Sequence, residues 1–124
     1  MLERQVVLKR QEVEDFLGKT ITGYELLPNK GGITFSCSNG YEYMATHLPD
    51  CCEEVILEDI SGNLDDLVGQ PIIIAETTTK DNENDTSPMW TFYKFATPKG
   101  YVTLRWVGTT SGCHSELEVD FYRK

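Results

Sequence analysis

Residues 15–21, DFLGKTI, and residues 66–72, DLVGQPI, follow one pattern: an acid, an apolar pair, a glycine and, three positions later, an isoleucine. Shorter matches follow in the same order along the chain, and an ordered series of matches indicates an internal repeat. The sequence therefore predicts one domain, residues 1–124, with similar halves at about 11–60 and 63–123. The further matches are Thr34-Phe35 with Thr91-Phe92, Gly40-Tyr41 with Gly100-Tyr101, and residues 51–55 with residues 113–117.

Each half has the pattern of one short helix followed by strands. The first helix is expected over residues 11–17, where apolar side chains recur at spacings of three and four, and it ends at Gly18. The second is expected over residues 64–68, with Ser61 or Asn63 as its N-cap. These two helices are the only helical segments that the pattern favours.

Alternating apolar and polar residues between turn signals predict the strands. Their connections are short enough for antiparallel neighbours. The predicted fold class is α+β, mainly an antiparallel β meander of about eight strands with two short helices, built from two similar helix-plus-four-strand halves that form one curved sheet or two packed sheets. The strands are expected at residues 20–27, 33–38, 41–46, 55–57, 72–75, 89–96, 101–107 and 115–122, and residues 80–88 as a loop.

The chain is acidic, with 20 Asp and Glu residues against 11 Lys and Arg residues and a net charge of −9. Direct nucleic-acid binding is not expected, because phosphate contacts need a basic surface. No apolar run approaches the roughly 20 residues of a membrane span, and the N-terminus lacks the basic and apolar regions of a signal peptide. These observations predict a cytoplasmic protein that does not contact membranes.

Acidic residues gather between residues 50 and 85, where Lys80 is the one basic residue. An acidic face of this kind steers a protein toward basic partners. The calcium-loop pattern is absent. Solvated acids, with Asp65 and Asp66 near the positive N-terminal end of their helix, are the favoured interpretation, followed by a partner-binding face and then by acid–base catalysis. The predicted partner-binding residues are Asp50, Glu53, Glu54, Glu58, Asp59, Asp65 and Asp66.

A second candidate site lies in the aromatic hairpin predicted over residues 89–107. Arg105 and Lys94 could hold a phosphate while Tyr93 and Trp106 stack on a nucleotide base. The favoured alternative is a core hairpin in which Arg105 pairs with an acid, for example from the acidic middle segment. Alternation along the strands puts Tyr93 and Phe95 on one face and Lys94 on the other.

Cysteine and histidine residues suggest a third, weaker candidate. Zinc sites use such residues in tetrahedral sets of four, but the chain has no C-x-x-C pair. Reduced cysteines, some of them buried, are the favoured interpretation, and no cofactor or catalytic set is expected. Whether a metal binds is left open for His47, Cys51, Cys52, Cys113 and His114.

Two long segments carry a family resemblance: DCCEEVILEDISGNLDDLVGQPIIIAE at residues 50–76 and WTFYKFATPKGYVTLRWVG at residues 90–108. With Ser115-Glu116 near the C-terminus, they resemble a small family carried by bacteriophages and their prophages, a domain of unknown function. The resemblance implies a phage setting and a stand-alone small domain, and it implies no activity. The chain departs from the family pattern at Gly112-Cys113-His114, which weakens the zinc hypothesis.

The sequence therefore predicts a non-enzymatic phage accessory protein that binds and inhibits a host factor of anti-phage defence. The acidic face would dock on a basic surface of that host protein. The alternative is a small-molecule sponge for a nucleotide immune signal, with its pocket at the seam of the two halves or at a homodimer interface. A zinc-stabilised domain or a metal-dependent enzyme is the third hypothesis.

Overall fold

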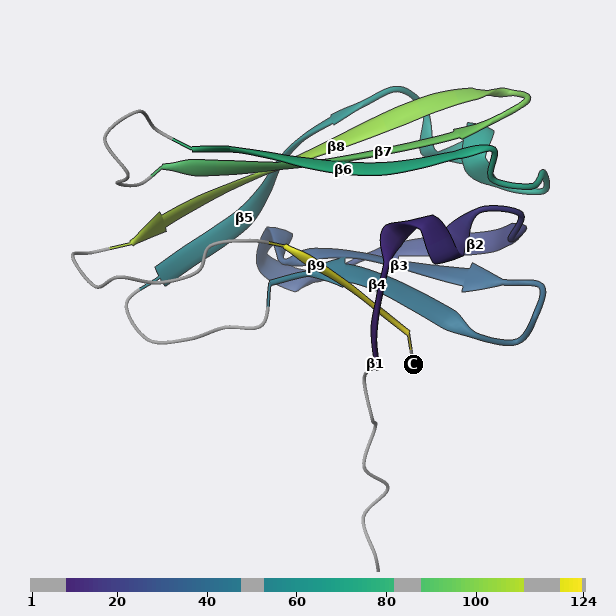
Figure 1. Cartoon of the computed structure of the whole chain (residues 1–124), viewed down its shortest axis with the longest axis horizontal. Coiled ribbons are helices and arrows are strands. Elements are labelled where there is room, and N and C mark those ends of the chain that lie inside the picture. Colours follow the sequence, from purple (N-terminus) through teal and green to yellow (C-terminus); the bar gives the residue numbers. More distant parts are fainter. Residues whose placement is uncertain (1–8, 48–52, 82–87, 111–118, 124) are drawn as a thin grey trace, which may run out of the picture.

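The computed structural model of the chain describes residues 9–47, 53–81, 88–110 and 119–123. They form two antiparallel β-sheets that lie in two layers (Figure 1). The first sheet has the strand order β1-β9-β4-β3-β2, and the second has the order β5-β8-β7-β6. The strands are β1 (Lys9–Gln11), β2 (Ile21–Leu26), β3 (Gly32–Cys37), β4 (Glu42–Thr46), β5 (Glu53–Ser61), β6 (Ile74–Asp81), β7 (Met89–Thr97), β8 (Gly100–Thr110) and β9 (Asp120–Arg123).

The predicted α+β class with two short helices is wrong, because the described residues contain only short 3-10 turns in place of α-helices. These turns are η1 (Val13–Phe16), η2 (Pro28–Lys30) and η3 (Leu64–Leu67). In η1 and η3 the buried apolar residues are three positions apart, which is the repeat of a 3-10 helix. Both η1 and η3 end after four residues, and so few residues do not offset the free-energy cost of nucleating an α-helix.

The predicted helix-plus-four-strand halves are also wrong, because strands from both halves build each sheet. Strands β2, β3 and β4 form a meander in the first sheet, but the next strand, β5, pairs with β8 in the second. Strands β6, β7 and β8 form the second meander, and β9 then returns to pair with β4 and β1. Neither half is therefore a separate folding unit, and each sheet is completed by a strand of the other half.

The two copies of the opening motif bind each other. The amide of Gly18 donates to the carbonyl of Ile72 at 2.8 Å, and the amide of Gly69 donates to the carbonyl of Ile21 at 2.9 Å. Both glycines have left-handed backbones, with φ of 81° and 89°, which side chains disfavour. We call residues 15–21 and 66–72 the clasp, since each copy holds the other at the seam of the sheets.

The core between the sheets is centred on Phe16, which is fully buried. This side chain comes from η1 and meets aromatic rings from both sheets, in tilted or edge-on geometries that ring pairs prefer. Its ring centroid lies 5.1–5.5 Å from those of Phe35, Tyr43, Phe95 and Phe121. The clasp therefore contributes Phe16, whose ring contacts both sheets.

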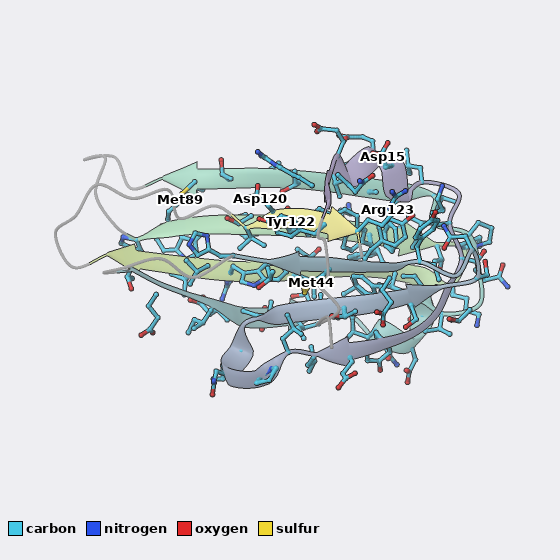
Figure 2. All side chains as sticks on the ribbon, turned by 90° about the horizontal axis from the view of Figure 1, so that it is seen from below. Asp15, Met44, Met89, Asp120, Tyr122 and Arg123 are labelled. Atoms are coloured by element: carbon cyan, nitrogen blue, oxygen red, sulfur yellow. The ribbon has the colours of Figure 1, made fainter. Side chains whose placement is uncertain are left out.

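The outer face of the first sheet carries an ion pair next to β9. Figure 2 looks onto this sheet and shows Asp120 and Tyr122 along β9, with Met44 on the neighbouring β4. Asp120 forms an ion pair of 3.1 Å with Arg10 on β1. This pair connects the short strand β1 to β9, which is the strand that completes the sheet.

Two details of the sequence-based repeat do not fit the structure. Phe35 is fully buried, whereas Phe92, its predicted counterpart, lies half-buried on the outer face of β7. By burial the counterpart of Phe35 is Phe95, and their ring centroids lie 5.6 Å apart. The predicted strand at residues 72–75 also differs in its bounds, because β6 spans Ile74–Asp81 and includes the first two residues of the loop expected at residues 80–88.

We predict that Phe16→Ala lowers the free energy of unfolding by about 3–5 kcal/mol, the usual cost of removing a buried aromatic ring. The matched control is Leu17→Ala, because Leu17 is the adjacent residue and is 44% exposed; it should cost less than about 1 kcal/mol. Urea unfolding followed by the fluorescence of the buried Trp106 measures both values. Equal losses in the two variants would show that Phe16 is not the centre of the core.

Candidate functional site

An open groove lies between the edge strand of the first sheet, β2, and the edge strand of the second, β5. Its volume is about 320 Å³, which is at the small end of the range for ligand pockets. Most of its lining is apolar, and charged side chains stand at its rim. The lining residues are Leu26, Leu27, Lys30, Gly32, Leu57, Glu58, Asp59 and Ile60.

The floor of the groove follows from the position of β2 at a sheet edge. Leu26 lies opposite the buried Ile33 of β3, and cross-strand partners point to the same face of a sheet. Leu26 therefore points toward the second sheet, but it lies at the margin of the core and is 51% exposed. Leu57 and Ile60 of β5 complete this apolar floor.

A β-bulge in β5 brings two carboxylates beside the groove, on the face of the sheet that carries Arg105. Leu57 pairs with Trp106, but the next paired residue is Asp59, opposite Arg105. Glu58 is thus the extra residue, and such a residue bends a strand and redirects its side chains. The bulge places Glu58 and Asp59 together at one rim.

The opposite rim is formed by η2, whose backbone is strained. Asn29 and Lys30 both have a φ of 57°, a left-handed conformation that costs roughly 1–2 kcal/mol for a residue with a side chain. The turn is held by Thr46, whose Oγ1 donates to the carbonyl of Gly31 at 2.8 Å. Gly32 lies so close to β4 that an added Cβ would be 2.1 Å from the carbonyl oxygen of Ala45. Strain of this kind is concentrated at functional sites.

Arg105 forms an ion pair with an acid of the middle segment, as the favoured interpretation of the hairpin predicted. Its Nη2 lies 2.7 Å from Oε1 of Glu58, and both side chains are more than a third exposed. Water screens such a pair, which typically contributes less than about 1 kcal/mol. Asp59 accepts a long hydrogen bond of 3.3 Å from Ser61, so its carboxylate remains open to a stronger donor.

The predicted acidic residues occupy two places rather than one face. Glu54, Glu58 and Asp59 are exposed on β5, whereas Asp65 and Asp66 lie in η3. Asp50 and the side chain of Glu53 lie outside the described residues.

The acids of η3 have structural partners. Asp65 accepts a hydrogen bond of 2.8 Å from the hydroxyl of Tyr24 on β2, and this bond raises the pKa of Tyr24. The predicted cap Asn63 accepts from the amide of Asp65 at 3.0 Å. The backbone carbonyl of Asp66 accepts from Thr97 at 2.5 Å. These contacts connect η3 to both sheets, so the strongest candidates for partner binding are the acids of β5.

The predicted nucleotide-binding residues do not face one pocket. Tyr93 and Trp106 are buried in the core, with ring centroids 5.6 Å apart. The hydroxyl of Tyr93 donates to the carbonyl of Val119 at 2.6 Å, and burial raises the pKa of Tyr93. Lys94 and Arg105 lie on the opposite, outer face of the sheet. The four side chains therefore cannot hold one ligand together.

The predicted metal set is only partly visible. His47 directly follows β4, whereas Cys51, Cys52, Cys113 and His114 lie outside the described residues. In the part of the chain that is described, no three His, Cys, Asp or Glu residues are grouped to hold a metal ion. No helix in that part is long and apolar enough to cross a membrane. Cys37 is a free, buried thiol, as expected for a reduced cysteine that packs as a small apolar residue.

Sequence reasoning missed the apolar half of the groove. Leu26-Leu27 before Pro28 was a usable signal, because two leucines at the end of an edge strand cannot both point into the core. The left-handed backbone of Lys30 had no such signal, and the bond from Thr46 of β4 that holds the turn joins residues distant in the sequence.

The chain belongs to the DUF7448 family, a domain of unknown function, whose model matches residues 14–118. The match includes both copies of the clasp and every residue that lines the groove. No curated protein and no solved structure matches the chain.

We predict that Cys37 makes stability depend on pH in the alkaline range. Burial raises the pKa of its thiol from 9.0 to about 11, although the charge of Lys19 acts in the opposite direction. Between these values the unfolded chain loses the thiol proton while the folded protein keeps it, so stability falls as pH rises. Below pH 9 this contribution is fully present.

Urea unfolding under reducing conditions at pH 8 and pH 10.5 tests this expectation. The loss of stability should be larger for the wild type than for Cys37→Ala, by about 1–2 kcal/mol. The comparison cancels the titration of tyrosines and lysines, which both proteins share. Parallel losses would mean that Cys37 is not buried as described.

Proposed function

We propose that this protein is a small phage-encoded accessory protein that binds and inhibits a host protein through the groove between β2 and β5. The observation that carries the proposal is the combination, in one groove, of an apolar floor with the carboxylates of Glu58 and Asp59, which outnumber the one cation of the lining, Lys30. A site of this composition suits a basic side chain of a protein partner. The proposed mechanism is occupation of a basic surface that the host protein needs for its own function.

The size of the groove favours a side chain over a large ligand. A volume of about 320 Å³ accommodates one or two long side chains of a partner. Arginine and lysine bury their aliphatic stems on apolar surface while the charged group stays at a polar rim. Leu26, Leu57 and Ile60 would receive the stem, and Asp59 would receive the charged group.

Electrostatics support a basic partner at longer range as well. The net charge of −9 attracts cationic surfaces and speeds their encounter. Among the described residues, Asp59 accepts one long hydrogen bond, from Ser61, which a stronger donor would replace, whereas Glu58 forms an ion pair with Arg105. Asp59 should therefore be the more important of the two carboxylates.

The phage setting rests on the family resemblance of residues 50–76 and 90–108, and inhibition of an anti-phage defence factor in the host cytoplasm is the role that this setting favours. Residues 57–60 of the groove belong to the first of these segments. The nucleotide-sponge alternative has no such support, because Tyr93 and Trp106 are in the core while Lys94 and Arg105 are outside it.

The partner can be identified by photo-crosslinking in a lysate of a defence-carrying host. A benzophenone amino acid at Leu26 places the probe in the groove, and the same residue at Leu17 is the control, since Leu17 is also exposed but does not line the groove. We expect a host protein that is crosslinked from position 26 and not from position 17. Equal crosslinking from both positions, or none from position 26, would contradict the proposal.

We predict that Asp59→Lys weakens binding to that protein at least tenfold, because it replaces the open carboxylate with a repelling charge. Glu14→Lys is the matched control: it makes the same charge change at an exposed residue of η1 and should alter the affinity less than twofold. Calorimetry measures both. The affinity for the wild type should also fall with added salt. An Asp59→Lys affinity equal to that of the wild type would exclude the groove as the binding site.

A further inference from the structure

Strand β6 is an exposed edge of the second sheet. It pairs with β7 over its whole length, Ile74–Asp81, and no strand of the described residues pairs with its other side. All five residues from Glu76 to Lys80 are exposed. The free side of such a strand presents backbone donors and acceptors to any strand that can align with it.

The other three edges are interrupted or short, and β6 is not. Register shifts break β2 between Ile21 and Gly23 and β5 between Leu57 and Asp59, and β1 has three residues. Short edges and bulges are the usual protection against pairing between molecules. The register of β6 with β7 is continuous over eight residues, so β6 is the edge of the described sheets that is best suited to receive another strand.

The sequence of this edge, Glu76-Thr77-Thr78-Thr79-Lys80, is complementary to itself. We propose that two copies of the chain form a symmetric dimer in which their β6 strands pair antiparallel, centred on Thr78. In this register Glu76 of each copy lies directly opposite Lys80 of the second copy, and the two ion pairs are related by the two-fold axis. Opposite charges in such cross-strand positions stabilise the pairing of strands, and like charges oppose it.

Only this register pairs the charges. A two-fold axis perpendicular to the sheet keeps each residue on its own face, so the pairing can shift only by two residues at a time. A shift one way places Lys80 opposite Ile74, and a shift the other way places it opposite Thr78. In both cases each Glu76 loses the cation on the second copy, leaving Lys94 of its own chain, on β7, as its cross-strand neighbour. The register centred on Thr78 is therefore the one that pairs the charges between the two copies.

The second copy would not cover the groove. Strands β5 and β6 are opposite edges of the second sheet, so pairing at β6 leaves both grooves at the ends of one continuous sheet. The dimer is therefore independent of the proposed function, and either can fail without the other. If both hold, the dimer presents two grooves to its partner, which strengthens binding to any partner with two matching sites.

A charge-swap series measured by sedimentation equilibrium tests the dimer. The wild type should dimerise, whereas Glu76→Lys and Lys80→Glu should each raise the dimer dissociation constant at least tenfold, because each places like charges opposite each other. The double variant E76K/K80E should return to within about threefold of the wild type, since it restores both pairs in exchanged positions. Glu54→Lys, with the same charge change as Glu76→Lys but on β5, is the control and should leave the constant unchanged.

A disulfide tests the register. In an antiparallel pair the Cα atoms of directly opposed residues lie about 4.5–5.5 Å apart, which is within the range that a disulfide bridges. Thr78→Cys should therefore form a dimer linked between the two new cysteines on mild oxidation, as mapped by mass spectrometry. Thr79→Cys should not, because residue 79 lies opposite residue 77.

The proposal is overturned by a wild type that stays monomeric up to about 100 µM, a concentration above the dissociation constants of specific weak dimers. It is also overturned by a dimer that the single charge variants leave intact, by a double variant that is not rescued, or by a disulfide that forms at position 79 as readily as at position 78.

Discussion

Three backbone hydrogen bonds between the copies of the clasp, one of them from the amide of Ile72 to the carbonyl of Lys19 at 2.9 Å, hold the arrangement on which the rest of the structure depends. Gly18 donates to Ile72 and Gly69 donates to Ile21, so each copy is the hydrogen-bonding partner of the other. The bonds place η1 and η3 at the seam, where Phe16 and Leu67 are both fully buried. The amides of Gly18 and Gly69 are presented by left-handed glycines. The repeated motif is thus a contact between the two halves of the chain.

The exchange of strands follows from this contact and creates the groove. Strand β2 begins the meander of the first sheet and forms its edge, and β5, which leaves that sheet to pair with β8, forms an edge of the second. The two exposed edges lie side by side, joined at η3 by the bond from Tyr24 to Asp65. Leu26 then has no cover from a further strand. The groove is therefore a consequence of the topology, and the bulge of β5 adds its carboxylates.

The sequence predicted those features of the structure that depend on residues close together in the chain. Alternation in the 89–107 hairpin put Tyr93 and Lys94 on opposite faces, as the structure has them, but did not say which face is the inner one. The acid-rich middle segment suggested the partner of Arg105. The class of η1 and η3 could not be decided, because four residues with apolar positions three apart fit a 3-10 turn and an α-helix equally. Alternation also cannot say which sheet a strand joins. Tyr93 and Trp106, which were predicted to contact a nucleotide, are core residues. The sequence could not show this, because aromatic residues that pack in a core and aromatic residues that bind bases follow the same alternating pattern.

The two edge strands of the second sheet, β5 and β6, carry different charges and therefore suit different partners. Strand β5 carries Glu54, Glu58 and Asp59, and an antiparallel copy of this strand would bring acids opposite acids, which repel each other. Strand β6 balances Glu76 against Lys80 and carries threonines between them, a composition that favours pairing on both faces. Self-association is thereby directed away from β5 and toward β6. The carboxylates of β5 repel a second copy of this strand, so this edge stays open to a basic partner. The same carboxylates therefore favour a cation in the groove and oppose self-association there.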